Sequence, residues 1–227
     1  MKVELLSYTP NCEEIVALAA RLCYSADDIS EIKRKMDGDR GVKLIEKLLD
    51  LGHESPFEHI NFTFGISGVS RALTHQLVRH RIASYSQKSQ RYVSEKNFEY
   101  IVPPKIKNNP QAYEIYRQLM VEIGEKYEKL VELGIANEDA RYVLPNSCET
   151  KIVVTMNARS LFNFFKHRAC VRAQWEIRAL ANEMLKLVKE KAPNVFKHAG
   201  ANCQLLGFCP EGEMGCGKVP TLKEVMK

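Results

Sequence analysis

The sequence has no long apolar run, and this bounds the kind of protein it can be. Nowhere do about 18 apolar residues follow one another, so we expect no transmembrane helix. The opening residues, MKVELLSYTP, lack the apolar core and small-residue cleavage pattern of a signal peptide. We therefore expect a cytoplasmic protein with no membrane partner.

Glycine-rich phosphate loops are also absent. The segment FGISGVS, which contains Gly65 and Gly68, does not match the G-x-G-x-x-G order of a dinucleotide-binding turn. A Rossmann-type cofactor site is therefore not supported.

The excess of one charge sign is small. The net charge of +5 and the pI near 8.7 fall short of the strongly basic balance of most nucleic-acid-binding domains. A mild positive charge suits attraction of small anions equally well. With 227 residues and 45% hydrophobic content, the chain can bury a real core.

The usual metal-binding patterns are missing as well. GHESPFEH holds two histidines and two glutamates, but it lacks the helical His-Glu-x-x-His order, and Pro56 disfavours a helix there. Cys203, Cys209 and Cys216 are spaced by six and seven, without the close cysteine pair of a structural zinc site. A fourth ligand would have to be His198 or come from another chain. We therefore expect no metal, and free thiols in this segment.

The other cysteines are scattered through apparent helices and strands. They are Cys12, Cys23, Cys148 and Cys170. With an odd total of seven, we expect them to be reduced thiols of a cytoplasmic protein.

Hydrophobic periodicity predicts alternating helices and strands. Expected strands span residues 3–8, 57–67 and 148–156. Expected helices span residues 12–25, 29–36, 42–51, 69–80, 110–134, 137–144, 158–169 and 173–192. This pattern favours one α+β domain over residues 1–227, with a small, mostly antiparallel sheet of about three or four strands flanked by long helices. From about residue 200, glycine and proline predict an irregular tail.

The stretch RHRIASYSQKSQRY, residues 79–92, concentrates cations and hydroxyls. It begins at the end of an expected helix, where cations interact favourably with the helix dipole, and continues into an expected loop. Arginine binds phosphate through a planar fork, and serine hydroxyls add neutral donors. Arg159 and Asn163 lie four residues apart and so share a helix face. These residues have the right chemistry for a nucleotide, although a solvated basic loop remains the plain alternative.

The same stretch resembles a known family signature. Arg-His-Arg, seven residues and then Ser89 is similar to the signature of the flavin-dependent thymidylate synthases. GHESPFEHINFTF precedes it, and ARYVLPNS, MNARSLFNFFKHRA and AQWEIR follow in the order of that family. The resemblance covers most of residues 50–190.

The resemblance implies a homotetramer with sites shared between subunits and FAD bound where they meet. It implies conversion of dUMP to dTMP, with 5,10-methylenetetrahydrofolate as carbon donor and NADPH as reductant. No cysteine lies in a recognised motif, so a direct flavin-hydride route without an enzyme nucleophile fits better than a cysteine route.

The resemblance also implies a role for individual residues. Around FAD it places Ser55, Arg79, His80, Arg81, Gln87, Asn157, Arg159 and Asn163. Around dUMP it places Gln76, Arg79, Gln87, Ser89, Gln90, Arg91, Arg141 and Arg168. His53 would lie near the flavin and the folate, and Arg168 would contact the uracil and favour its ionisation at N3.

Gln87 departs from the family pattern, which commonly has Glu there. An amide keeps the hydrogen-bonding capacity but loses the charge, so a charge-based role at this position is in doubt. The alternative function is a nucleic-acid-binding module that uses residues 79–91 on a phosphate backbone. It would need a broad basic face with stacking aromatics, whereas here acids interleave with the cations.

Overall fold

The protein is α+β, as the periodicity predicts. The computed structural model describes residues 1–36 and 38–226, so Lys227 at the end of the expected tail lies outside the described residues. Four strands form one antiparallel sheet in the order β1-β2-β4-β3. They are β1 (Lys2–Tyr8), β2 (Asn61–Ser70), β3 (Ser84–Gln87) and β4 (Glu149–Asn157).

The chain divides into two compact units. Unit 1 comprises residues 1–2, 66–79 and 85–153, and unit 2 comprises residues 3–65, 80–84 and 154–227. The chain passes from one unit to the other within β2 and again within β4. The single-domain organisation expected from the sequence stays a prediction.

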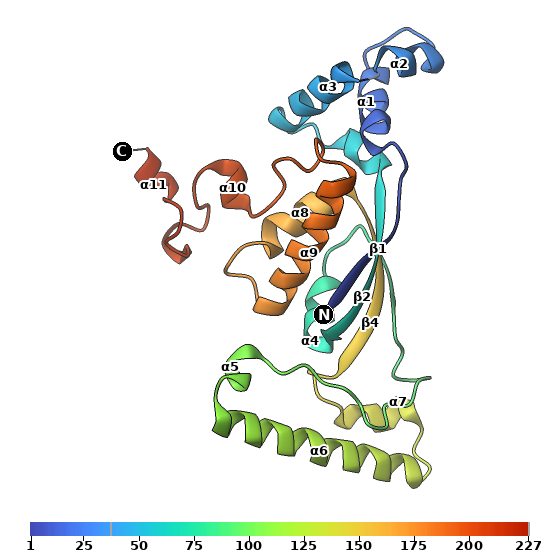
Figure 1. Ribbon diagram of the computed structural model, residues 1–227, viewed down its shortest axis with the longest axis vertical. Coiled ribbons are helices and arrows are strands. Elements are labelled where there is room, and N and C mark those ends of the chain that lie inside the picture. Colours follow the sequence, from blue (N-terminus) through green and yellow to red (C-terminus); the bar gives the residue numbers. More distant parts are fainter. Residues whose placement is uncertain (37, 227) are drawn as a thin grey trace. The chain divides into compact units, whose positions relative to one another are not determined.

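Unit 1 carries the longest helix. Its helical segments are α4 (Arg71–Leu77), α5 (Pro104–Lys107), α6 (Pro110–Glu132), α7 (Asn137–Ala140) and η2 (Arg141–Val143). The Asn109 side chain caps α6 by accepting the N–H groups of residues 111 and 112, both at 3.1 Å. Met120 and Tyr127 are its buried residues, and Met120 packs with Phe98 and Cys148. α5, α6 and α7 lie together in Figure 1.

Unit 2 holds the larger aromatic core. Its helical segments before the tail are α1 (Cys12–Leu22), α2 (Ile29–Lys35), α3 (Asp39–Asp50), η1 (Ser55–His59), α8 (Ala158–Arg168) and α9 (Trp175–Lys191). Phe196 stacks edge-on against Phe62, Phe162 and Phe165 at ring-centroid distances of 5.4, 5.3 and 6.3 Å. Such edge-on aromatic pairs add stability beyond the burial of their area. They fix α8, which carries several expected site residues, against the segment that follows α9.

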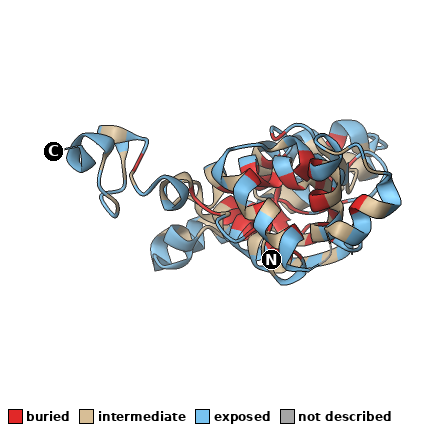
Figure 2. Cartoon of the chain, turned by 90° about the horizontal axis from the view of Figure 1, so that it is seen from above, coloured by how far each residue is buried: buried red, intermediate tan, exposed pale blue. Residues whose placement is uncertain are grey.

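The C-terminal tail has only short helical turns. These are α10 (Asn202–Leu206), η3 (Gly212–Met214) and α11 (Leu222–Val225). Figure 2 draws this segment mostly as exposed or intermediate, and the buried residues gather in the body of the molecule. The tail therefore combines these short helical turns with irregular segments, and its separation from the rest of the domain stays a prediction.

Several boundaries differ from the predicted ones by a few residues, and the differences nearest to the expected site are these. β2 extends to Ser70, so the helix expected from residue 69 begins only at Arg71, where the Ser70 hydroxyl accepts the Leu73 N–H at 3.0 Å. Residues 57–59 form part of a 3-10 helix rather than the start of a strand, because Pro56 occupies its first turn. Residues 84–87, expected as loop, form β3.

No helix within residues 1–36 and 38–226 is long and apolar enough to cross a membrane.

Candidate active site

The expected site residues divide between the two units. Unit 1 contains most of those expected around dUMP, namely Gln76, Arg79, Gln87, Ser89, Gln90, Arg91 and Arg141. Unit 2 contains Arg168 and most of those expected around FAD, namely His53, Ser55, His80, Arg81, Asn157, Arg159 and Asn163. Each set is described within its own unit.

Gln87 fixes the position of β3 in unit 1. Its amide nitrogen donates to the hydroxyls of Thr74 at 3.0 Å and Thr150 at 3.3 Å. Nearby, the Tyr85 hydroxyl donates to the Leu77 carbonyl at 2.9 Å. The amide therefore ties β3 to α4 and β4, which is a structural role that needs no charge.

The two residues after Lys88 point in different directions. Ser89 Oγ accepts the backbone N–H of Arg91 at 3.2 Å, which leaves its hydroxyl hydrogen as the donor. The Gln90 side chain is buried, and its amide nitrogen lies 3.4 Å from Cys148 Sγ. Ser89 is thus suited to a ligand contact, whereas the amide nitrogen of Gln90 is directed into the interior.

Arg91 and Arg141 meet at one glutamate, although they are far apart in the sequence. Nε and Nη2 of Arg91 lie 2.9 and 2.8 Å from Oε2 of Glu138. Nε of Arg141 donates to the backbone carbonyl of the same Glu138 at 3.0 Å. The first turn of α7 therefore brings two guanidinium groups together, which the sequence could not reveal because Glu138 belongs to no motif.

A partly buried ion pair joins two residues of the same loop. Lys88 Nζ lies 2.9 and 3.0 Å from the two carboxylate oxygens of Glu95, which is buried. Arg71 donates from Nη2 to the Lys88 carbonyl at 2.8 Å. Tyr127 accepts the Glu95 N–H on its hydroxyl at 3.1 Å. Two cations and a carboxylate thus hold residues 88–95 in place, and sequence reasoning missed Arg71 and Glu95.

In unit 2, Arg159 lies between two carboxylates. It forms ion pairs with Glu58 and, at 3.5 Å, with Glu54. Glu54 also pairs with Lys166 at 3.2 Å. Both glutamates come from GHESPFEH, so that segment supplies partners for cations. Within residues 1–36 and 38–226, no group of three or more potential ligands is placed to hold one metal ion.

The two asparagines of α8 differ in their roles. Asn157 caps the helix, because its Oδ1 accepts the Ser160 N–H at 2.8 Å. Asn163 has an exposed side chain, and its backbone carbonyl lies 2.7 Å from Nδ1 of His167. Asn163 therefore keeps its amide for a ligand, whereas Asn157 has a local structural task.

His80 and Arg168 form the best-defined contact of unit 2. Nε of Arg168 donates to Nε2 of His80 at 2.9 Å, and the His80 ring packs edge-on against Phe164 at 5.0 Å. Burial, followed by the charges of Arg168 and His167, lowers the pKa of His80 from the usual 6.5 to about 4. His80 is thus a neutral acceptor near pH 7, and it holds the Arg168 guanidinium in one orientation.

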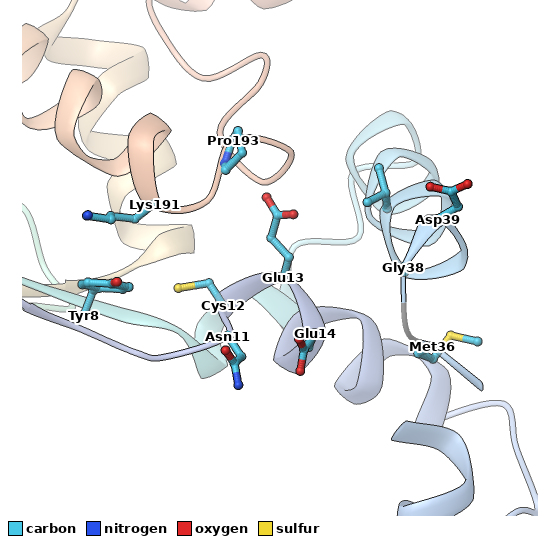
Figure 3. Close-up of a pocket in the computed structure, with 12 residues that line it drawn as sticks. Tyr8, Asn11, Cys12, Glu13, Glu14, Met36, Gly38, Asp39, Lys191 and Pro193 are labelled. Carbon is cyan, nitrogen blue, oxygen red and sulfur yellow. The ribbon is translucent and has the colours of Figure 1, made fainter. Parts of the chain in front are cut away.

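Two pockets of unit 2 lie outside the expected residue set. The one in Figure 3 has a volume of about 540 Å³, and its wall includes Glu13, Glu14 and Asp39. These carboxylates make it unsuited to phosphates. A second pocket of about 460 Å³ contains Glu54 and Lys166 in its wall, and it therefore borders the ion pairs around Arg159.

Comparison with known proteins identifies the family. The family described as thymidylate synthase complementing protein matches residues 4–194. The chain belongs to this family. The tail after residue 194 lies outside the matched range.

Relatives in the family share much of the sequence. A protein of Clostridium tetani is 51% identical, over 99% of this chain and 96% of its own length. One of Geobacter sulfurreducens is 51% identical, over 100% of this chain and 98% of its own length. One of Pyrococcus abyssi is 43% identical, over 96% of this chain and 94% of its own length. Each of these three proteins is named flavin-dependent thymidylate synthase.

Proposed function

We propose that the chain is a flavin-dependent thymidylate synthase that converts dUMP to dTMP. It uses FAD as cofactor, 5,10-methylenetetrahydrofolate as carbon donor and NADPH as reductant. It acts in the cytoplasm as a homotetramer whose sites are shared between subunits. Family membership and the side-chain chemistry of both units support this proposal.

The meeting of Arg91 and Arg141 at Glu138 carries the proposal. Two guanidinium groups and one carboxylate leave one net positive charge there. A phosphate dianion is a stronger partner for guanidinium forks than a half-exposed carboxylate, because it offers more charge and more acceptor oxygens. Ser89 adds a neutral donor from the same loop. The dUMP phosphate therefore binds at Ser89, Arg91 and Arg141.

The residues of unit 2 fit a flavin nucleotide by their donor chemistry. Arg81, Arg159 and Asn163 have exposed polar side chains, which suit a pyrophosphate bound without a glycine-rich loop. When bound, FAD supplies the electron-transfer chemistry that these side chains lack. Arg159, which pairs with Glu58 in the free chain, would hold the phosphate oxygens of the nucleotide, while Glu54 would keep Lys166 as its partner.

In this proposal Arg168 acts on the base. Its hydrogen bond to His80 fixes the orientation of the guanidinium. Because the pKa of His80 is lowered to about 4, the imidazole is neutral near pH 7 and does not repel the guanidinium. A guanidinium against the uracil stabilises negative charge at N3 and the neighbouring carbonyl oxygen. His80 is therefore a positioning residue, and Arg168 is the catalytic one.

The nucleic-acid-binding alternative is less well supported. Lys88, Arg91 and Arg159 each already pair with a carboxylate, so the cations do not form an uninterrupted basic face. A nucleic-acid binder would show affinity for DNA that falls steeply with salt.

The test compares two arginines in similar ion pairs. Arg91 pairs with Glu138 at 2.8 Å and Arg117 pairs with Glu114 at 2.7 Å, and about half of each arginine side chain is exposed. We expect Arg91→Ala to raise the KM for dUMP at least roughly tenfold, the loss of a charge-assisted hydrogen bond. Arg117→Ala should leave dTMP formation unchanged. Equal KM values in the two variants, or no dTMP from the parent protein, would refute the proposal.

A further inference from the structure

Four cysteines from separate segments line one pocket of unit 2. Cys170 lies in the connection between α8 and α9, Cys203 lies in α10, and Cys209 and Cys216 flank η3. The pocket has a volume of about 450 Å³. None of these thiols belongs to the site proposed above, although Arg168 of that site is part of the same pocket wall.

Specific contacts hold these segments against one another. Arg172, two residues after Cys170, binds the Met214 carbonyl and lies 3.7 Å from the Glu211 carboxylate. It therefore attaches the loop between Cys209 and Cys216 to the segment of Cys170. Gly215 lets the chain pass close to Cys209, since a Cβ there would lie 3.0 Å from Cys209 Sγ. A short irregular tail is thus folded so that its thiols face one space.

The way the four thiols share one pocket bears on the kind of ligand they could bind. A single zinc ion binds four sulfurs at about 2.3 Å, which requires the sulfurs to be close together. Within residues 1–36 and 38–226, no three potential ligands are placed to hold one ion. An iron–sulfur cluster spreads its cysteine ligands over several iron atoms, so it suits thiols that share a cavity but lie farther apart. We propose that Cys170, Cys203, Cys209 and Cys216 bind an iron–sulfur cluster.

The charges around the pocket favour such an anionic group. Its wall includes Lys166, Arg168, Arg172 and Lys218, against the carboxylate of Glu211. The cluster fastens the tail to the loop that follows Arg168.

This proposal departs from the free thiols expected from the sequence. The spacing of the three tail cysteines offered no fourth ligand of the same type, because Cys170 lies in a distant segment. Only the folded chain brings Cys170 to the tail.

The test is a chemical analysis of the full chain purified without oxygen, or reconstituted with ferrous iron and sulfide. We expect iron and acid-labile sulfide in equal amounts, between about two and four of each per chain. Because a flavin absorbs visible light as well, the cluster is identified by these two assays and by electron paramagnetic resonance after reduction. About one zinc per chain without sulfide, or no metal and seven titratable thiols, would overturn the proposal.

Matched variants separate a built site from adventitious iron. Cys216→Ser changes an exposed pocket cysteine, and Cys23→Ser changes an exposed cysteine outside the pocket. We expect Cys216→Ser to lose most of the iron and sulfide and Cys23→Ser to retain both. Cys170→Ser changes the connection between α8 and α9 rather than the tail. This variant should lose the cluster, while its circular dichroism spectrum stays the same as that of the parent protein. Equal iron in all of these proteins would refute the assignment.

Discussion

The arginines proposed to bind ligands already hold carboxylates in the free protein. Arg91 pairs with Glu138, and Arg159 pairs with Glu58 and Glu54. Binding of a phosphate is therefore an exchange of partners, which costs little because exposed ion pairs contribute only about 0–1 kcal/mol. In the proposed function the carboxylates hold the guanidinium groups in place before the nucleotide binds.

Replacing Ser89 tests the phosphate assignment by removing a single proposed hydrogen bond to the phosphate. Ser89→Ala should weaken dUMP binding by about 1.5–3 kcal/mol, the value of a hydrogen bond to a charged group. Measured kinetics should show a raised KM for dUMP with turnover retained at saturation. Ser86→Ala, in the same segment, is the control and should change neither constant. Complete loss of turnover with dUMP binding intact would instead mean that Ser89 acts in the chemical step.

The lowered pKa of His80 makes a prediction about acid stability. Between its usual 6.5 and the folded value of about 4, the unfolded chain binds a proton that the folded chain does not. The free energy of unfolding therefore falls as the pH drops through this window. His80→Gln keeps an acceptor for Arg168 without titrating, so urea denaturation of this variant should show a weaker dependence on pH between 4 and 6.5. The same change at exposed His75 should leave the parent slope, and an unchanged slope in His80→Gln would contradict the assignment.

At the scale of elements, β3 organises the nucleotide loop. Thr74 accepts from Gln87 and donates its own hydroxyl hydrogen to the Arg71 carbonyl at 3.0 Å. Its hydrogen-bonding capacity is thus matched to an amide donor. This explains how the chain accommodates Gln87 where the family commonly has Glu.

Restoring the family residue should therefore destabilise this protein. In Gln87→Glu the carboxylate has no hydrogen to donate to the Thr74 hydroxyl oxygen. Either the Thr74 hydroxyl turns its hydrogen from the Arg71 carbonyl to the carboxylate, or the carboxylate and the hydroxyl oxygen face each other with no hydrogen between them. We expect a loss of about 1–3 kcal/mol, the cost of a mismatched buried polar group, measured by chemical denaturation. Gln87→Met, which removes both the donor and the charge, is the control for lost packing. A Gln87→Glu protein as stable as the parent would show that the amide donor is dispensable.

Periodicity predicted the long elements well and the short ones poorly. α6 and α9 carry apolar residues at helical spacing over many turns, so their existence was evident in the sequence. β3 has only four residues and lies in a stretch whose charge suggests a loop, and its pairing in the sheet and the contacts of Gln87 come from distant segments. Residues 69 and 70 likewise belong to β2 because the strand pairs with distant segments of the chain, which the local pattern does not show.

The candidate site was predictable to a similar degree. The arginines stood out by residue type and by family resemblance, but their partners did not. Glu138, Glu95 and Arg71 lie in no motif, and each acts through a contact that only the folded chain forms. The low pKa of His80 comes from burial and from the charges of Arg168 and His167, which lie far from His80 in the sequence.

At the scale of the whole molecule, the proposed function requires residues of both units. The arginines proposed for the dUMP phosphate lie in unit 1, and Arg168 lies in unit 2. In the proposed homotetramer Arg91 and Arg141 of one subunit act together with Arg168 of a neighbouring subunit, so one complete site takes side chains from two chains.

Subunit exchange tests this sharing. Arg141→Ala and Arg168→Ala proteins should each be poorly active. Mixed and allowed to exchange, they should regain part of the dTMP-forming activity, because some mixed sites carry both arginines. Each variant alone, taken through the same exchange procedure, is the control. No recovery despite exchange demonstrated by mass spectrometry would count against shared sites.

The most direct test of the central claim is a single turnover of the flavin-loaded protein. The protein is reduced with NADPH without oxygen and mixed with dUMP and 5,10-methylenetetrahydrofolate, while the absorption spectrum and the dTMP formed are recorded. The account predicts that the flavin bands bleach on reduction and return as about one dTMP forms per flavin. A protein that purifies colourless, gains no thermal stability from added FAD and forms no dTMP would contradict it.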